Sequence, residues 1–302
     1  MSENVDKQKK AVETAFRKEL NKHGYAFQCA VYEAWREFVE GSMRGFGLWK
    51  WAFEAFEFPV AVQGSGTRTD LILKHREKPE YLLVECKRVN PSLAHWGFTH
   101  YPAVHKRRYE GRFFAERFER RENRCYAEGK RYSTGCHEWY YCDIALELKV
   151  SQPDQGARGG RGAIEEAASQ ACRSLNGMVE CFARRPELGS NAVFVPVIFT
   201  TAKLWSCEGL ALASATDLQT GKVGTSEAIT PKEEKWVFYE YHQSPGIKHS
   251  LSPITPITPS SDSPDLELGL LMDREYIRTI PIVNAGNITA FLQSLSLSPF
   301  SD

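Results

Sequence analysis

The chain has 302 residues, and its 38 basic and 38 acidic side chains give a formal net charge of zero at neutral pH. This balance excludes attraction of nucleic acid by overall charge, so a nucleic-acid partner would need a local basic patch. The 42% hydrophobic and 25% charged content is typical of a soluble globular protein. No apolar run approaches the ~20 residues that span a bilayer, and the polar start SENVDKQKK predicts no signal peptide. We therefore expect one large cytoplasmic domain, residues 1–302, without a membrane partner.

Two amphipathic helices are predicted at the beginning of the chain. Apolar residues recur at helical spacing within residues 6–22, and again between Phe27 and Phe38. Gly24 and Gly41 are the expected ends of these two helices.

Three strands are predicted next. Residues 58–63 form an apolar strand, and residues 64–66 form a glycine-rich turn into a second strand that carries Asp70. The polar residues 74–80 suit a hairpin connection, and residues 81–86 form the third strand. The aromatic-rich run before the first strand, GFGLWKWAFEAFEF, is expected to pack in the core and not to stack on nucleic-acid bases.

Charged residues stand at matching places on the two strands of this hairpin. Because strand side chains alternate between faces, Glu85 and Lys87 point the same way. If Asp70 meets Glu85, two carboxylates and one ammonium share a small site, which is costly unless something compensates the charges. A hard divalent cation such as Mg²⁺ would do so, because it takes oxygen ligands.

Asp70, followed after a hairpin by Glu85-Cys86-Lys87, resembles the core motif of the PD-(D/E)xK nuclease superfamily. Thr69 stands where the family's nominal proline would be. The resemblance implies an α/β restriction-endonuclease-like core, in which helices flank a mixed central sheet. It also implies a hydrolase, a metal-dependent endonuclease that cleaves phosphodiester bonds, with DNA as the first candidate substrate and RNA as the second. A role in restriction or anti-phage defence would fit the superfamily.

The resemblance implies a role for each motif residue. Asp70 and Glu85 would hold one or two Mg²⁺ or Mn²⁺ ions, with the carbonyl of Cys86 as an extra ligand. Lys87 would position or deprotonate the attacking water and stabilise the charged transition state.

Two further site residues are implied by the same family. The superfamily often carries an additional acid on the helix before the first core strand, and either Glu33 or Glu37 matches that place, with Glu33 taken as the candidate. Several branches have a glutamine on the next core helix that supports the metal-bound water, and Gln170 is the matching position. Each of these residues could equally be an ordinary helix side chain.

Residues 90–134 read as an insertion in a core that spans residues 25–207. Its arginines, interleaved with aromatic rings, could contact phosphates; Arg107, Arg108 and Arg112 are the candidates for nucleic-acid binding. Glutamates alternate with these arginines, which is also typical of a solvated helix face. Both interpretations stay open.

A second acid-x-lysine pair is a rival for the metal site. Residues 139–150 are predicted as a strand, on which Glu147, Lys149 and Asp143 share one face. This strand lacks the preceding hairpin strand with an aspartate, so it ranks second. The alternative is a half-exposed strand with a polar face.

The eight cysteines contain no CxxC pair and are expected to be reduced thiols. Cys125, Cys136, His137 and Cys142 match no closed zinc pattern, so a zinc site is not expected.

A strong helix is predicted over residues 163–184, and the apolar run 191–201 is typical of a strand buried on both faces. Residues 204–207 and 210–213 are expected to extend the same sheet.

The remaining residues, 208–302, form a predicted C-terminal extension that completes the same domain. It contains strands at 236–241 and 276–283, a helix at 288–295, and a Ser- and Pro-rich mobile loop at 243–265.

Two alternatives to catalysis remain open. One is a catalytically silent nuclease-fold module that binds nucleic acid or a protein partner, and the other is an interaction protein in which the acid-x-lysine motif is accidental. Whether the chain forms a homodimer or uses a partner protein also stays open.

Overall fold

The computed structural model describes residues 2–42, 50–89, 94–100, 113–136, 140–148, 162–207, 217, 219–220, 224, 229–254 and 274–299. The helices of this part are α1 (Ser2–His23), α2 (Tyr25–Ser42), α4 (Ala163–Arg184) and α7 (Ile288–Ser294). The strands are β1 (Trp51–Val62), β2 (Ser65–His75), β3 (Glu80–Lys87), β4 (His95–Thr99), β5 (Phe113–Arg121), β6 (Arg124–Thr134), β7 (Tyr141–Cys142), β8 (Ile144–Leu148), β9 (Asn191–Thr200), β10 (Lys203–Cys207), β11 (Pro231–Glu234), β12 (Trp236–His242), β13 (Ile277–Asn284) and β14 (Leu297–Pro299).

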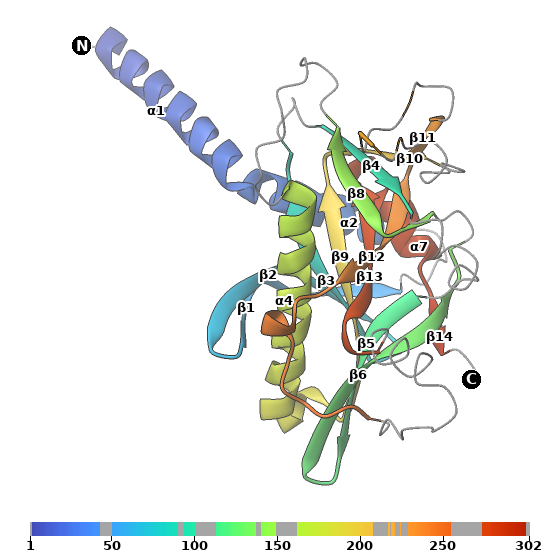
Figure 1. Ribbon diagram of the computed structural model, residues 1–302. Helices are drawn as coiled ribbons and strands as arrows, with labels where there is room; N and C mark the ends of the chain where they lie inside the picture. The colour runs from blue at the N-terminus through green and yellow to red at the C-terminus, as the bar shows by residue number, and fades with distance from the viewer. Residues whose placement is uncertain are drawn as a thin grey trace.

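A large mixed sheet forms the centre of the fold (Figure 1), in the order β1-β2-β3-β9-β13-β12-β7. β1, β2 and β3 pair antiparallel, and β9 then pairs parallel with β3 after the crossover through α4. The predicted helix 163–184 and the predicted strand 191–201 are confirmed as α4 and β9. The α/β class with a mixed sheet flanked by helices is therefore confirmed as well.

Helices cover both faces of this sheet because the strands are apolar on both sides. On one face, α4 packs through Leu175 and Met178 against Ile72 and Leu83. On the other face, α2 and α7 contribute to a second cluster that contains Leu71 and other strand residues. Side chains that alternate along β2 and β3 therefore point either to α4 or to the α2 and α7 side.

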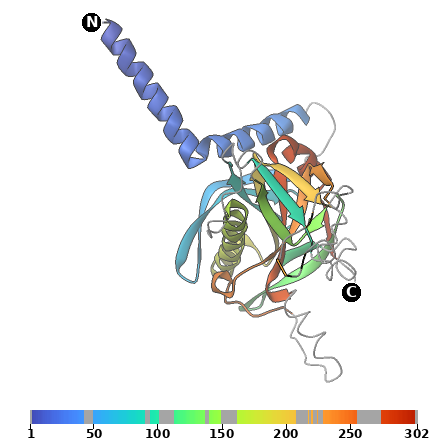
Figure 2. The same ribbon diagram turned by 45° about the horizontal axis from the view of Figure 1, so that its top comes forward.

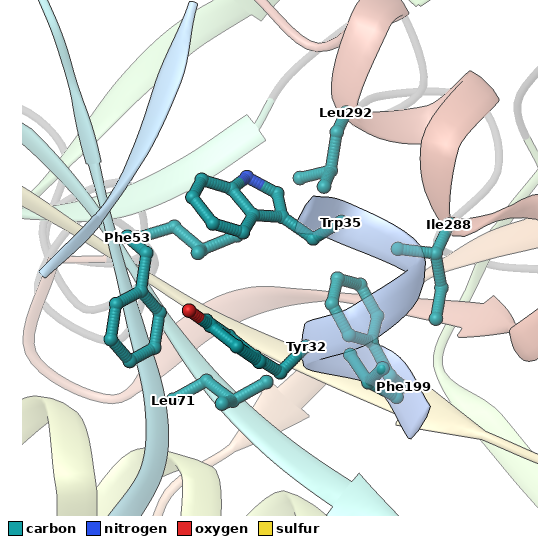
Figure 3. A pocket seen from close by; sticks show the side chains of 9 residues that line it. Tyr32, Trp35, Phe53, Leu71, Phe199, Ile288 and Leu292 are labelled. Carbon is teal, nitrogen blue, oxygen red and sulfur yellow. The ribbon is translucent and has the colours of Figure 1, made fainter. Parts of the chain in front are cut away.

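A cluster of apolar side chains fixes α2 on the sheet, as Figure 3 shows. Tyr32 and Trp35 of α2 approach Phe53 of β1, with ring centroids 4.8 Å and 5.9 Å apart, respectively. Leu71, Phe199, Ile288 and Leu292 line the same small cavity of about 10 Å³, together with Val31 and Leu73. This volume is about that of one water-sized sphere, so the cluster is packing and not a ligand pocket.

The arginine-rich segment between the core strands is a β-hairpin and not a charged helix. β5 and β6 pair antiparallel, and β5 continues the large sheet by pairing with β9. The segment predicted as an insertion thus supplies strands to the sheet. Phe113, Phe114 and Phe118 are buried, which explains their interleaving with charged residues. Arg107, Arg108 and Arg112 lie outside the described residues.

Two predictions about sheet membership are wrong. β10 does not extend the large sheet; it lies in a four-stranded sheet with the order β11-β10-β4-β8. The strand predicted over residues 139–150 is interrupted at Asp143, so that β7 joins the large sheet and β8 joins the small one. Predicted residues 210–213 lie outside the described part.

The C-terminal extension forms the middle of the large sheet. β13 and β12 confirm the predicted strands at 276–283 and 236–241, and β13 lies between β9 and β12. α7 confirms the predicted helix at 288–295. The predicted loop 243–265 is described only to residue 254, and Pro245–Ile247 there forms a turn of 3₁₀ helix.

The N-terminal helix α1 projects away from the rest of the molecule in both views (Figures 1 and 2). Gly24, with a φ of 76°, separates it from α2. Among the described helices, none combines the length with the apolar content that a bilayer crossing requires.

Candidate metal and catalytic site

Asp70 and Glu85 face each other where the β2–β3 ladder ends. The last paired residues are Leu71 and Val84, so Asp70 and Glu85 are the next positions along the two strands. At this point the backbone N–H of Cys86 donates a hydrogen bond of 2.7 Å to Oδ2 of Asp70. The aspartate side chain thus takes the place of a strand partner and fixes its own carboxylate beside β3.

Lys87 lies on the same face of β3 as Glu85 and reaches α4. Its Nζ atom is 3.0 Å from Oε2 of Glu166, which belongs to the first turn of that helix. The exposed fractions of the two side chains are 21% for Lys87 and 55% for Glu166. The structure therefore brings the three motif residues Asp70, Glu85 and Lys87 to one end of β3.

Glu57 of β1 adds a further carboxylate. The β1–β2 register pairs Phe56 with Leu71 and Phe58 with Thr69, which places Glu57 opposite Asp70. Its φ of 50° lies in the left-handed region that residues other than glycine rarely adopt. The side chain is 24% exposed, and its carboxylate lies 3.6 Å from the guanidinium of Arg68.

The crowding of acids changes the protonation of the site. The pKa of Asp70 is raised to about 6, mainly by burial and also by the negative charge of Glu57, while the Cys86 N–H opposes the shift. The pKa of Glu85 lies well above its ordinary value, first because of burial and then because of the charge on Asp70. Lys87 lowers the pKa of Glu85, but Glu166 and Glu57 raise it. The site therefore contains more negative charge than its one ammonium compensates.

The helix before the first core strand supplies an amide instead of an acid. Glu33 is exposed and its carboxylate lies 2.6 Å from Arg36, so the structure does not bring it to the site. Glu37 is exposed as well. Gln28, which is buried on the opposite face of α2, lowers the pKa of Asp70 through its side-chain amide.

Gln170 lies one helical turn after Glu166, on the same side of α4. Its Oε1 atom is buried and has no hydrogen-bond partner among the described residues. A buried acceptor without a partner carries a desolvation cost, which a water molecule in the site would remove.

The rival acid, Glu147, has a structural role. Its Oε1 atom accepts the backbone N–H of Ala163, and that of Ile164 at 3.3 Å. Glu147 thereby caps α4, whose own N-cap residue is Gly162 and offers no side-chain acceptor. Lys149 lies outside the described residues, and the backbone N–H of Asp143 bonds to Thr99.

The cysteines considered for zinc are dispersed. The Sγ atoms of Cys125, Cys136 and Cys142 contact Ala183, Ser294 and Phe238, respectively. His137 lies outside the described residues. Across the part of the chain that the structure describes, no three His, Cys, Asp or Glu side chains are grouped to hold a metal ion by themselves.

The residues at the end of β3 fit Mg²⁺ or Mn²⁺ by their chemistry. Asp70 and Glu85 supply carboxylate oxygens, and Cys86 between Glu85 and Lys87 supplies a backbone carbonyl. Mg²⁺ is usually held by one or two carboxylates and keeps several waters. A cation would also remove the repulsion that raises the pKa values of both acids.

Three residues of this site were not found from the sequence: Glu57, Gln28 and Glu166. Glu57 could have been found, because counting outward from the Gly64 turn along the two strands pairs position 57 with position 70. Gln28 and Glu166 come from helices whose rotation against the sheet depends on packing.

Comparisons of this chain with models of protein families, with curated proteins and with solved structures gave no match.

Proposed function

We propose that this protein is a metal-dependent nuclease that hydrolyses phosphodiester bonds, with DNA as the first candidate substrate and RNA as the second. The observation that carries the proposal is the meeting of Asp70 and Glu85 at the end of the β2–β3 ladder, with Lys87 on the same face as Glu85. Neighbouring acids whose pKa values are raised mark functional sites more often than purely structural ones.

The arrangement of elements around these residues supports the same proposal. α2, β1, β2, β3, α4 and β9 occur in this order along the chain, with β4 to β8 between β3 and α4, and β9 pairs parallel with β3. This order is compatible with a restriction-endonuclease-like core, which the resemblance to the PD-(D/E)xK superfamily implies. Restriction or anti-phage defence is the biological setting that this resemblance favours.

The proposed mechanism assigns one task to each residue. Asp70 keeps Oδ1 available for a cation, since Oδ2 accepts the Cys86 N–H. Glu85 and the Cys86 carbonyl would be the other protein ligands. Mg²⁺ or Mn²⁺, when bound, supplies positive charge beside the phosphate and lowers the pKa of a water. Lys87 donates hydrogen bonds to the attacking water and to the developing phosphate charge, and Gln170 accepts one from that water.

Substitution of the three motif residues tests the proposal. Asp70→Asn, Glu85→Gln and Lys87→Ala should each lower Mg²⁺-dependent cleavage by about 100-fold or more, because each removes a group that acts on the transition state. The assay compares duplex DNA, single-stranded DNA and RNA, with and without a chelator. Glu54→Gln, at an exposed position of β1, is the matched control and should keep full activity.

Two results would overturn the nuclease proposal. Cleavage that persists in all three variants would place the chemistry elsewhere. The absence of any Mn²⁺ binding that depends on Asp70, together with no cleavage of any of the three substrates, would instead indicate the catalytically silent nuclease-fold module.

A further inference from the structure

More than one carboxylate is available as an ion-pair partner for the ammonium of Lys87. Asp70, Glu85 and Glu166 all act on this end of β3, and Glu85 is only two positions away on the same face of the strand. Lys87 nevertheless forms its ion pair with Glu166 of α4, with Nζ 3.0 Å from Oε2. An ammonium attracted to the more buried Glu85 would occupy the carboxylate that a metal ion requires.

We propose that Glu166 is a positioning residue that holds Lys87 away from Glu85, so that the Asp70–Glu85 pair stays open to a divalent cation. The inference rests on the proposed nuclease function, because it concerns how that site is kept competent. Glu166 itself touches neither the reacting phosphate nor the ion; it acts through Lys87.

The surroundings of Glu166 agree with positioning more than with stabilisation of the fold. Its side chain is 55% exposed, and an ion pair at such a position contributes little to stability, because water screens the charges. Its neighbour Glu165 provides a contrast, since the Glu165 carboxylate accepts a hydrogen bond of 3.1 Å from the Tyr241 hydroxyl. Glu165 therefore ties α4 to β12, whereas Glu166 is directed to Lys87.

Titration calorimetry with Mn²⁺ on the full chain tests the inference without requiring catalysis. Glu166→Ala frees Lys87 to pair with Glu85, and the Mn²⁺ affinity should fall about tenfold, the scale seen when a residue that orients a metal ligand is lost. Glu166→Gln removes the same charge but keeps an acceptor for Lys87, so it should restore most of the affinity. Glu165→Ala, on the same helical turn, should leave the Mn²⁺ affinity unchanged.

A double-mutant cycle separates positioning from a simple loss of negative charge. If Glu166 acts through Lys87, the double variant Glu166→Ala/Lys87→Ala should bind Mn²⁺ with the same affinity as Lys87→Ala alone. A further loss of the same size in the Lys87→Ala background would overturn the inference, because the carboxylate would then act directly on the ion. An unchanged affinity in Glu166→Ala alone would overturn it as well.

The failure of the nuclease proposal would look different. Wild-type protein that binds no Mn²⁺ would remove the metal site and, with it, both proposals. Wild-type protein that binds Mn²⁺ with the affinity unaffected by Glu166→Ala would remove only the positioning role.

Discussion

The carboxyl group of Asp70 is buried, and the residues around it do not fully compensate its negative charge. Its pKa is raised to about 6 from an ordinary value of 3.8, mainly by burial. The protonated form is therefore favoured in the folded state, and this contribution to stability is complete below pH 3.8 and disappears as the pH rises through about 6. In the metal-free protein, the negative charge that develops at Asp70 should thus oppose folding at neutral pH.

Asp70→Asn should consequently stabilise the metal-free protein at pH 7.5 and have little effect at pH 4. The expected gain is roughly 1–3 kcal/mol, the free energy that corresponds to a shift of one to two pKa units. Urea unfolding in the presence of a chelator measures it, and Glu54→Gln serves as the control. Mn²⁺ at pH 7.5 should raise the unfolding free energy of the wild type only. An equal effect of Mn²⁺ on Asp70→Asn would contradict the assignment of the ligand.

Glu116 shows the opposite electrostatics, and its role is structural. It is fully buried on β5, where Arg278 and His249 contact its two oxygens. These partners hold the pKa of Glu116 at about 2, against the cost of burial. The stabilisation is present above the ordinary pKa of 4.5 and is lost as the pH falls towards 2.

Glu116→Gln should therefore destabilise the protein at pH 7 by about 3–5 kcal/mol, because it leaves Arg278 as a buried charge without its carboxylate. The difference from wild type should shrink as the pH falls from 4.5 towards 2, because the Glu116 carboxyl of the unfolded wild-type chain is protonated in this range. Denaturant unfolding across this pH range measures it. Glu119→Gln on the same strand, whose arginine partners are more exposed, should cost less than about 1 kcal/mol. Equal losses for both variants would contradict the burial argument.

At the scale of elements, local patterns in the sequence were sufficient for α4, β9 and the β2–β3 hairpin. The apolar stripe of 163–184 and the turn chemistry of 74–80 determine type and approximate ends without reference to the rest of the chain. Sheet membership could not be read in this way. β7 and β8 are adjacent in the chain, but their pairing partners lie about 97 and about 50 residues away, respectively. A pattern in a single sequence contains no information on such pairing. The same limit applies to Gln28 and Glu33, because the rotation of α2 decides which one faces Asp70.

At the scale of elements, a stability prediction can be made for the N-terminus of α4. This helix carries both Glu166 and Gln170. Glu147→Ala leaves the first N–H groups of α4 without their acceptor and should cost about 1 kcal/mol, as the loss of a helix cap generally does. Glu147→Gln keeps an acceptor oxygen and should cost less. The midpoint of thermal unfolding measures both, with exposed Glu187→Ala as the control. No difference between Glu147→Ala and the control would show that the cap does not stabilise the helix.

At the scale of the whole molecule, the sheet and its helices are built from nearly the whole length of the chain. β13, in the middle of the sheet, follows β9 by more than 70 residues, and its parallel pairing with β9 buries Ile280 and Ile282. The C-terminal extension, which the sequence predicts to complete the same domain, therefore supplies strands to the middle of the large sheet. Truncation from the C-terminus should accordingly abolish folding.

The N-terminal helix α1 should behave differently. All of its side chains from residue 6 to residue 20 are exposed, including Val12, Phe16 and Leu20, which lie four residues apart on one face. Because no buried contact of these side chains is lost, deletion of residues 1–23 should shift the thermal midpoint by less than about 2 °C. Differential scanning calorimetry at two protein concentrations measures the shift. A larger decrease that grows at higher protein concentration would contradict the expectation and would indicate that the Val12–Phe16–Leu20 stripe packs against a second copy of the chain in solution.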